Sequence, residues 1–172
     1  VDTLFHDRLP DDMTLSFNLT RPELAIEAIH AERRLVLLGE PGYGKSTVLR
    51  YLALLLARRI RGATVDLFGW PPDELPIPIL CPLGSVAAAL DAHGGDADKA
   101  LWQALGDVLD GPQGISAGLS DFLKPALRRG GVLLLLDGLD ELPTGANNDG
   151  PRRRVAAAVQ RLAGRTRARI VV

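Results

Sequence analysis

The sequence has few of the features that mark disulfide-bonded, membrane-spanning or nucleic-acid-binding proteins. Its 172 residues include one cysteine, Cys81, so no disulfide can form within it. A single cysteine suits a reducing compartment, and we therefore expect a cytoplasmic protein. No apolar run reaches the roughly 18 residues of a membrane span. The formal net charge of −1 gives no basis for a membrane partner or for direct nucleic-acid binding.

Lysine is also scarce, since only Lys45, Lys99 and Lys124 stand among the 20 basic residues. Lys45 lies in the segment LVLLGEPGYGKST, where four apolar residues run into a glycine-rich loop. From Gly39 this segment fits G-x-x-x-x-G-K-[ST], the phosphate-binding P-loop pattern. Glycine allows backbone N–H groups to surround a phosphate. Lysine is a compact charge that can follow the β- and γ-phosphates, whereas the planar fork of arginine would crowd the loop.

The P-loop pattern predicts a nucleotide site at the start of the following helix, whose N-terminus favours anions. We expect Lys45 to be catalytic and Ser46 to ligate Mg²⁺ beside the phosphates of ATP or ADP. The predicted nucleotide-binding residues are Gly39, Glu40, Pro41, Gly42, Tyr43, Gly44, Lys45, Ser46 and Thr47.

A second pattern follows the apolar run Val132–Leu136, which ends in Asp137. An aspartate at the tip of a buried strand is where a P-loop enzyme places the partner of its Mg²⁺, so Asp137 is the predicted metal residue. Asp140 and Glu141 lie just beyond, and one of them is expected to orient the attacking water. Three neighbouring carboxylates repel one another unless a cation lies among them, which favours a metal-dependent site.

The remaining patterns alternate strands with helices, which indicates a parallel sheet covered on both faces. Thr20–Glu23 has the residues of a helix start. The strand at Ile77–Leu80 is marked by prolines, which cannot donate to a sheet ladder, so we place it at an edge. The expected helices are 45–61, 96–109, 119–129 and 151–163, and the expected strands are 35–38, 77–80, 132–136 and 169–172.

With both motifs in hand, the chain resembles the NACHT family, in the STAND class of P-loop ATPases, of the bacterial type. A small residue after the metal aspartate, followed by an acidic pair, is the most specific part of the resemblance. The matching stretches are GEPGYGKST (39–47), LRYLALLLA (49–57), LPIPILCPLGSVA (75–87) and LLLLDGLDELP (133–143).

The resemblance implies an α/β, three-layer P-loop NTPase fold with a parallel sheet in the order 5-1-4-3-2. Strand 5 would be missing from this segment. Residues 1–30 would form a lead-in with a helix, and residues 31–172 a NACHT-like nucleotide-binding domain truncated at its C-terminal end.

The family also implies an activity: an intracellular signalling switch in immunity or defence, closed with ADP and opened by ATP and oligomerisation. Self-association, and effector and sensor domains outside this segment, are the implied partners. Hydrolysis would be Mg²⁺-dependent and weak in the isolated segment. The alternatives are an AAA+-like ATPase, a P-loop kinase, or a scaffold that binds nucleotide without turning it over.

Overall fold

The computed structural model describes residues 25–67, 70–71, 74–94, 96–110, 119–144 and 150–172. The helix start predicted at Thr20–Glu23 lies outside these residues, as does most of the predicted lead-in. None of the helices in the described ranges is long and apolar enough to cross a membrane.

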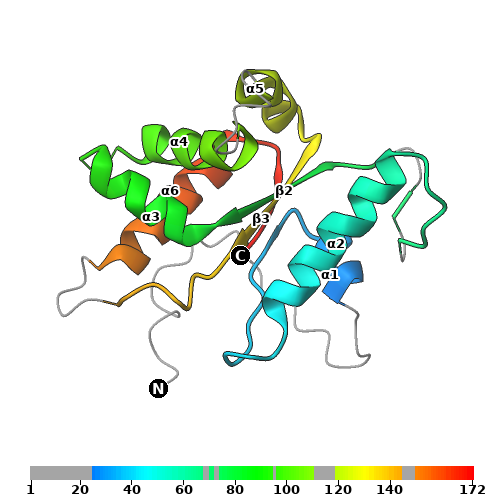
Figure 1. The fold of residues 1–172 in the computed structure, drawn as a ribbon, viewed down its shortest axis with the longest axis horizontal. Helices are drawn as coiled ribbons and strands as arrows, with labels where there is room; N and C mark the ends of the chain where they lie inside the picture. Colours follow the sequence, from blue (N-terminus) through cyan, green and yellow to red (C-terminus); the bar gives the residue numbers. More distant parts are fainter. Residues whose placement is uncertain (1–24, 68–69, 72–73, 95, 111–118, 145–149) are drawn as a thin grey trace.

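Among the described residues, the centre of the fold is a parallel sheet of four strands in the order β1-β4-β3-β2. This order confirms the 1-4-3-2 portion of the predicted sheet and places the proline-marked β2 at an edge (Figure 1). The strands are β1 (Arg34–Leu35), β2 (Ile77–Pro82), β3 (Val132–Asp137) and β4 (Arg169–Val171).

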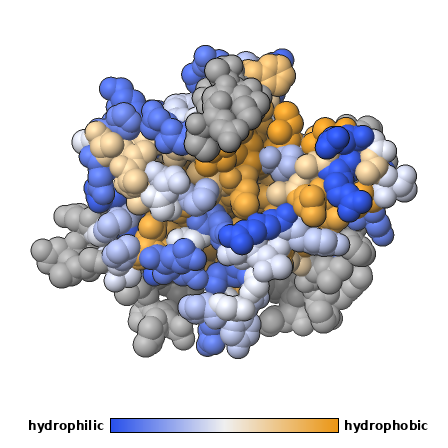
Figure 2. All heavy atoms as spheres, in the orientation of Figure 1, coloured by the Kyte–Doolittle hydropathy of each residue, from blue (hydrophilic) through white to orange (hydrophobic). Residues whose placement is uncertain are grey.

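Helices cover both faces of the sheet, as the alternating pattern predicts (Figure 1). On one face lie α1 (Ala25–Ala31) and α2 (Lys45–Ile60). On the other lie α3 (Leu83–Ala92), α4 (Ala97–Asp110), α5 (Leu119–Arg129) and α6 (Pro151–Arg165). In the space-filling view, hydrophobic residues gather along the middle of the molecule, between the two helical layers (Figure 2).

Helix α3 was not predicted from the sequence. Pro82 and Gly84 look like breaks in the chain, but Pro82 stands at the N-cap with extended backbone angles, just before the helix starts. A proline is tolerated at a helix start because the first N–H groups have no helical partner. The fully buried Leu83 and Val86 recur at helical spacing, which is the signal that was missed.

Strand β3 joins the two cores. Leu133 and Leu135 pack against α1 and α2, while Val132, Leu134 and Leu136 face α3–α6. Successive side chains of a strand point to opposite faces, so a strand covered on both sides needs apolar residues at every position. The uninterrupted run before Asp137 therefore gave a correct prediction.

The same argument fails for the strand predicted at Leu35–Leu38. Leu35 and Leu37 pack against the α1–α2 core, but Val36 is 51% exposed and Leu38 is 86% exposed. The core formed by α3–α6 includes residues of β2, β3 and β4 and none of β1, so one face of β1 is uncovered by it. Pairing still extends past the strand, since the Leu37 amide donates to the Val172 carbonyl at 2.8 Å.

Candidate functional site

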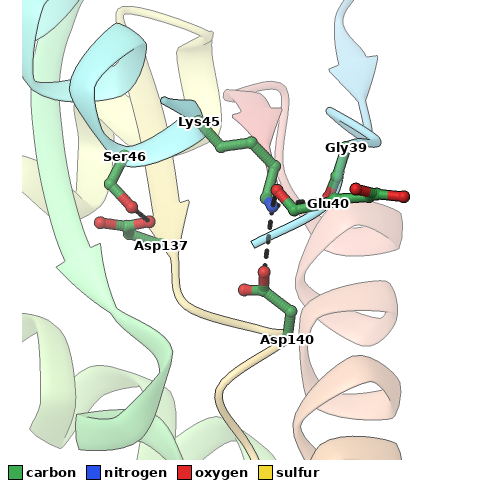
Figure 3. Close-up of polar contacts among 6 residues, drawn as sticks. All are labelled: Gly39, Glu40, Lys45, Ser46, Asp137 and Asp140. Atoms are coloured by element: carbon green, nitrogen blue, oxygen red, sulfur yellow. Dashed lines mark hydrogen bonds and ion pairs between the residues drawn. The ribbon is translucent and has the colours of Figure 1, made fainter. Parts of the chain in front are cut away.

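The two sequence motifs meet at the carboxyl ends of parallel strands. The loop after β1 leads into α2, and β3 ends at Asp137 in the same sheet. Parallel strands present their carboxyl ends at one edge, and ligands of open α/β sheets bind there. Residues about 90 positions apart therefore lie side by side, as the contact between Ser46 and Asp137 shows (Figure 3).

The glycine-rich loop uses backbone angles that other residues seldom adopt. Gly42 has a φ of 87° and Gly44 a φ of 82°, both in the left-handed region where a Cβ is strained. A Cβ at either position would meet no atom of the described residues within 4 Å, so conformation, rather than space, requires glycine. Gly44 is the N-cap of α2 and makes no side-chain cap, which leaves the first N–H groups of α2 available to an anion.

The Lys45 ammonium group lies between the loop and the turn after β3. Its Nζ donates to the Gly39 carbonyl at 2.7 Å and to the Glu40 carbonyl at 3.2 Å. It also pairs with Asp140 Oδ2 at 3.0 Å (Figure 3). The hydrogen bond from Lys45 holds the pKa of Asp140 below its ordinary value of 3.8, against a smaller opposing effect of burial.

Ser46 and Asp137 form the second contact, with the Ser46 hydroxyl donating to Asp137 Oδ1 at 2.7 Å. Asp137 Oδ2 faces Arg50 at 3.7 Å, and the Asp137 side chain is only 15% exposed. Arg50 was missed in the sequence, although it stands four residues after Ser46 and hence on the same face of α2. The predicted metal residues are thus brought together, with a cation beside them.

Glu141 lies over the turn that follows Asp137. Gly138 has a φ of 85°, and a Cβ there would come within 3.2 Å of Glu141 Oε2. A side chain at position 138 would therefore be strained and would crowd the Glu141 carboxylate. Glycine at this position lets the chain turn back so that both Asp140 and Glu141 face the P-loop.

A cavity of about 460 Å³ opens between the loop and this turn. Most predicted site residues line it, whereas Gly39 and Glu40 contribute through their carbonyls to Lys45. Tyr43 is 74% exposed and does not line the cavity. The lining residues are Pro41, Gly42, Gly44, Lys45, Ser46, Thr47, Asp140 and Glu141.

The carboxylates at and after the end of β3 take different partners. Asp137 accepts a hydrogen bond from Ser46, whereas Asp140 pairs with Lys45, so Lys45 provides a cation beside Asp140. In the described ranges, no three His, Cys, Asp or Glu side chains come together as a metal site. Ser46 and Asp137 remain, and their oxygens fit Mg²⁺, which keeps several waters and takes few protein ligands.

Comparison with known proteins agrees with this geometry. The family described as AAA ATPase domain matches residues 23–172, which includes every element of the site. Comparisons with curated proteins and with solved structures find no match. A P-loop that opens α2, an aspartate at the tip of β3 and a parallel sheet are the parts that a nucleotide-binding ATPase module requires. The chain belongs to the AAA ATPase domain family of P-loop ATPases.

Proposed function

We propose that the chain is an ATP-binding, slowly hydrolysing switch module of the NACHT type, within the STAND class. The observation that carries this is the turn after β3. Gly138 has a left-handed backbone, and the Glu141 carboxylate lies close above it. A small residue followed by an acidic pair, as in the resembled family, is therefore what this turn requires. That turn brings both Asp140 and Glu141 to the cavity.

The site residues take the following roles in this proposal. The backbone from Gly39 to Thr47 surrounds the phosphates, and Lys45 contacts the β- and γ-phosphates. Ser46 and Asp137 hold Mg²⁺, which would neutralise charge on the phosphates. Their 2.7 Å contact supports this pairing.

Glu141, rather than Asp140, is the better candidate to orient the attacking water. Asp140 is engaged by Lys45 at 3.0 Å, and a carboxylate with a lowered pKa is a weaker base. Glu141 lines the cavity and, within the described ranges, forms no ion pair. Of the three residues expected to be catalytic, Lys45 contacts the phosphates, Glu141 orients the water, and Asp140 contacts Lys45.

In the same proposal, residues 31–172 form the nucleotide-binding domain and residues 1–30 lead into it. Ile29 of α1 is 0% exposed in the core around α2, so the end of the lead-in packs onto the domain. The implied setting is cytoplasmic, within a larger immune or defence sensor, with self-association and with effector and sensor domains elsewhere in the protein.

The family match itself favours a second candidate, an AAA+ ATPase that works by continuous turnover. The two differ in kinetics. A switch holds ADP and turns over slowly, whereas a remodelling ATPase releases ADP and cycles. The two are separated by loading the protein with ADP, adding excess ATP and measuring the rate at which ADP is released. A release rate below about one per minute supports the switch. A rate of about one per second or faster supports the AAA+ ATPase.

The residue roles are tested with Asp137→Ala and Glu141→Gln. Asp137→Ala should weaken Mg²⁺-dependent ATP binding while leaving binding without Mg²⁺ close to wild type. Glu141→Gln should bind ATP normally and hydrolyse it at least about tenfold more slowly, since positioned bases contribute 10²–10⁴-fold. Calorimetry measures the binding and phosphate release measures the turnover. Normal turnover in Glu141→Gln would assign the water to another residue.

A further inference from the structure

The Lys45 ammonium group is saturated by the protein itself. It has three N–H donors and no acceptor. The structure gives it three oxygen partners: the Gly39 carbonyl, the Glu40 carbonyl and Asp140 Oδ2. Figure 3 shows the Lys45 ammonium group between the loop residues Gly39 and Glu40 on one side and Asp140 on the other. No donor is left over for a phosphate in this arrangement.

We propose that Asp140 is an internal substitute for the nucleotide phosphate, which holds Lys45 until nucleotide displaces it and so sets nucleotide affinity. Since Lys45 must bind phosphate for this to matter, the role rests on the function proposed above. It gives Asp140 a task different from that of Glu141, although the two are adjacent in sequence. Asp140 acts on Lys45 and is an affinity-determining residue, not a base.

The chemistry of the pair fits displacement. A carboxylate and a phosphate are both anionic oxygen acceptors, so each can take the same Lys45 donor. The two carbonyl contacts come from the loop that would surround the phosphates, while the Asp140 contact comes from a different segment, after β3. An incoming phosphate can therefore take the donor that Asp140 holds without first disturbing the loop contacts.

The ion pair between Lys45 and Asp140 is only partly buried, so a ligand can break it. The Lys45 side chain is 22% exposed and the Asp140 side chain 35% exposed. Water and salt reach such a pair and weaken it. A fully buried pair would trap Lys45, and a fully exposed pair would scarcely compete with nucleotide, so intermediate burial suits a competitor that yields to a ligand.

The kinetic consequence follows from the two states of Lys45. Only molecules in which Lys45 has left Asp140 can bind productively, so the apparent dissociation constant is the intrinsic constant divided by that fraction. Removing the Asp140 charge raises the fraction. Association should then become faster, while dissociation, which starts from a complex without the pair, should not change.

The binding experiment uses ADP with a chelator present, so that metal does not contribute. Stopped-flow measurement should show about fivefold faster association for Asp140→Asn, with dissociation rates within about twofold of wild type, since ion pairs that water can reach contribute up to about this much. Asp91→Asn is the matched control because it removes a carboxylate that pairs with Arg154 at 2.8 Å, and neither residue lines the cavity. Glu141→Gln measures the through-space effect of one cavity charge, and its gain should be clearly smaller. An equal gain in Glu141→Gln, or a change confined to dissociation, overturns the role of Asp140.

A second measurement needs no nucleotide and exploits the scarcity of lysine. Acetylation of Lys45, Lys99 and Lys124 is followed by mass spectrometry in wild type and in Asp140→Asn. Lys99 and Lys124 each pair with an aspartate three residues earlier, so they serve as internal references. In Asp140→Asn, Lys45 should be acetylated several-fold faster, while the rates at Lys99 and Lys124 stay unchanged. If the asparagine variant folds poorly, Asp140→Ser should give the same result. An unchanged Lys45 rate refutes the pair, whereas failure of wild type to bind ADP or ATP refutes the proposed function alone.

Discussion

At position 138 the backbone, rather than a side chain, controls the site. Gly138→Ala should lower the free energy of unfolding by about 1–2 kcal/mol, the cost of a left-handed backbone for a residue with a Cβ. The new methyl group would also meet Glu141 Oε2 at 3.2 Å and displace the carboxylate. Urea denaturation measures the first effect, and the rate of ATP hydrolysis measures the second.

Gly164→Ala is the matched control. Gly164 lies inside α6, its φ is not in the positive range, and a Cβ there meets no atom within 4 Å in the part of the chain that the structure describes. Alanine should therefore stabilise the protein by up to about 1 kcal/mol. If both substitutions change stability in the same direction, the strained turn at Gly138 is not the cause.

Individual residues of the site were predictable to different degrees. Ser46 and Asp137 were expected to act together, and the structure places them 2.7 Å apart. The pairing of Lys45 with Asp140 was not expected, because a motif gives positions along the chain and not which oxygen a flexible lysine selects. Arg50 was missed for the same reason, since its 3.7 Å approach to Asp137 depends on how α2 lies against β3.

At the scale of elements, β2 shows that an edge strand can carry a buried thiol. Cys81 is 0% exposed in the core formed with α3–α6, and burial raises its pKa from 9.0 to about 11. At pH 8 only about 0.1% of such a thiol is ionised, and the thiolate is the reactive form. Cys81 should therefore react with a disulfide reagent at least a hundredfold more slowly in the native protein than in urea.

The same shift makes stability depend on alkaline pH. The folded protein keeps the Cys81 proton up to about pH 11, while the unfolded chain loses it near 9.0. Stability from this group is complete below pH 9 and declines as pH rises toward 11. Cys81→Ala removes this contribution, so the difference in unfolding free energy between wild type and variant should shrink above pH 9. A constant difference would mean that the thiol titrates alike in both states.

Elements with unambiguous patterns were predicted well, and those at the margins of the cores were not. Prolines placed β2 at an edge, and the apolar run of β3 gave a strand buried on both faces. The apolar residues of β1 suggested the same, yet Val36 and Leu38 are exposed. Hydrophobicity indicates that a residue can be buried, but only the reach of the helices over the sheet decides whether it is.

For the whole molecule, nucleotide binding should appear as stability. A ligand that binds only the folded state adds about 2.7 kcal/mol at one hundred times its dissociation constant. For a chain of this size this corresponds to a rise in Tm of about 5–11 °C. Differential scanning fluorimetry with ADP and Mg²⁺ should show that rise for wild type and none for Lys45→Ala.

Lys99→Ala provides the control for the lost charge. Lys99 is 73% exposed at its side chain and pairs locally with Asp96, far from the loop in sequence and outside the cavity lining. This variant should keep the full ADP-dependent rise in Tm. A rise that survives in Lys45→Ala would show that the stabilising ligand binds elsewhere on the molecule.

The sequence by itself determined the fold class, the loop that opens α2 and the residues available for phosphate and metal. These are local consequences of periodicity, glycine conformation and the place of Asp137 at the end of an apolar run. Only the tertiary structure decided which charges meet: Asp140 turns to Lys45, Asp137 to Ser46 and Glu141 to the cavity. Each pairing depends on how the strand order brings two segments that are distant in sequence to one edge of the sheet. A local sequence pattern contains no information on the distance between such segments.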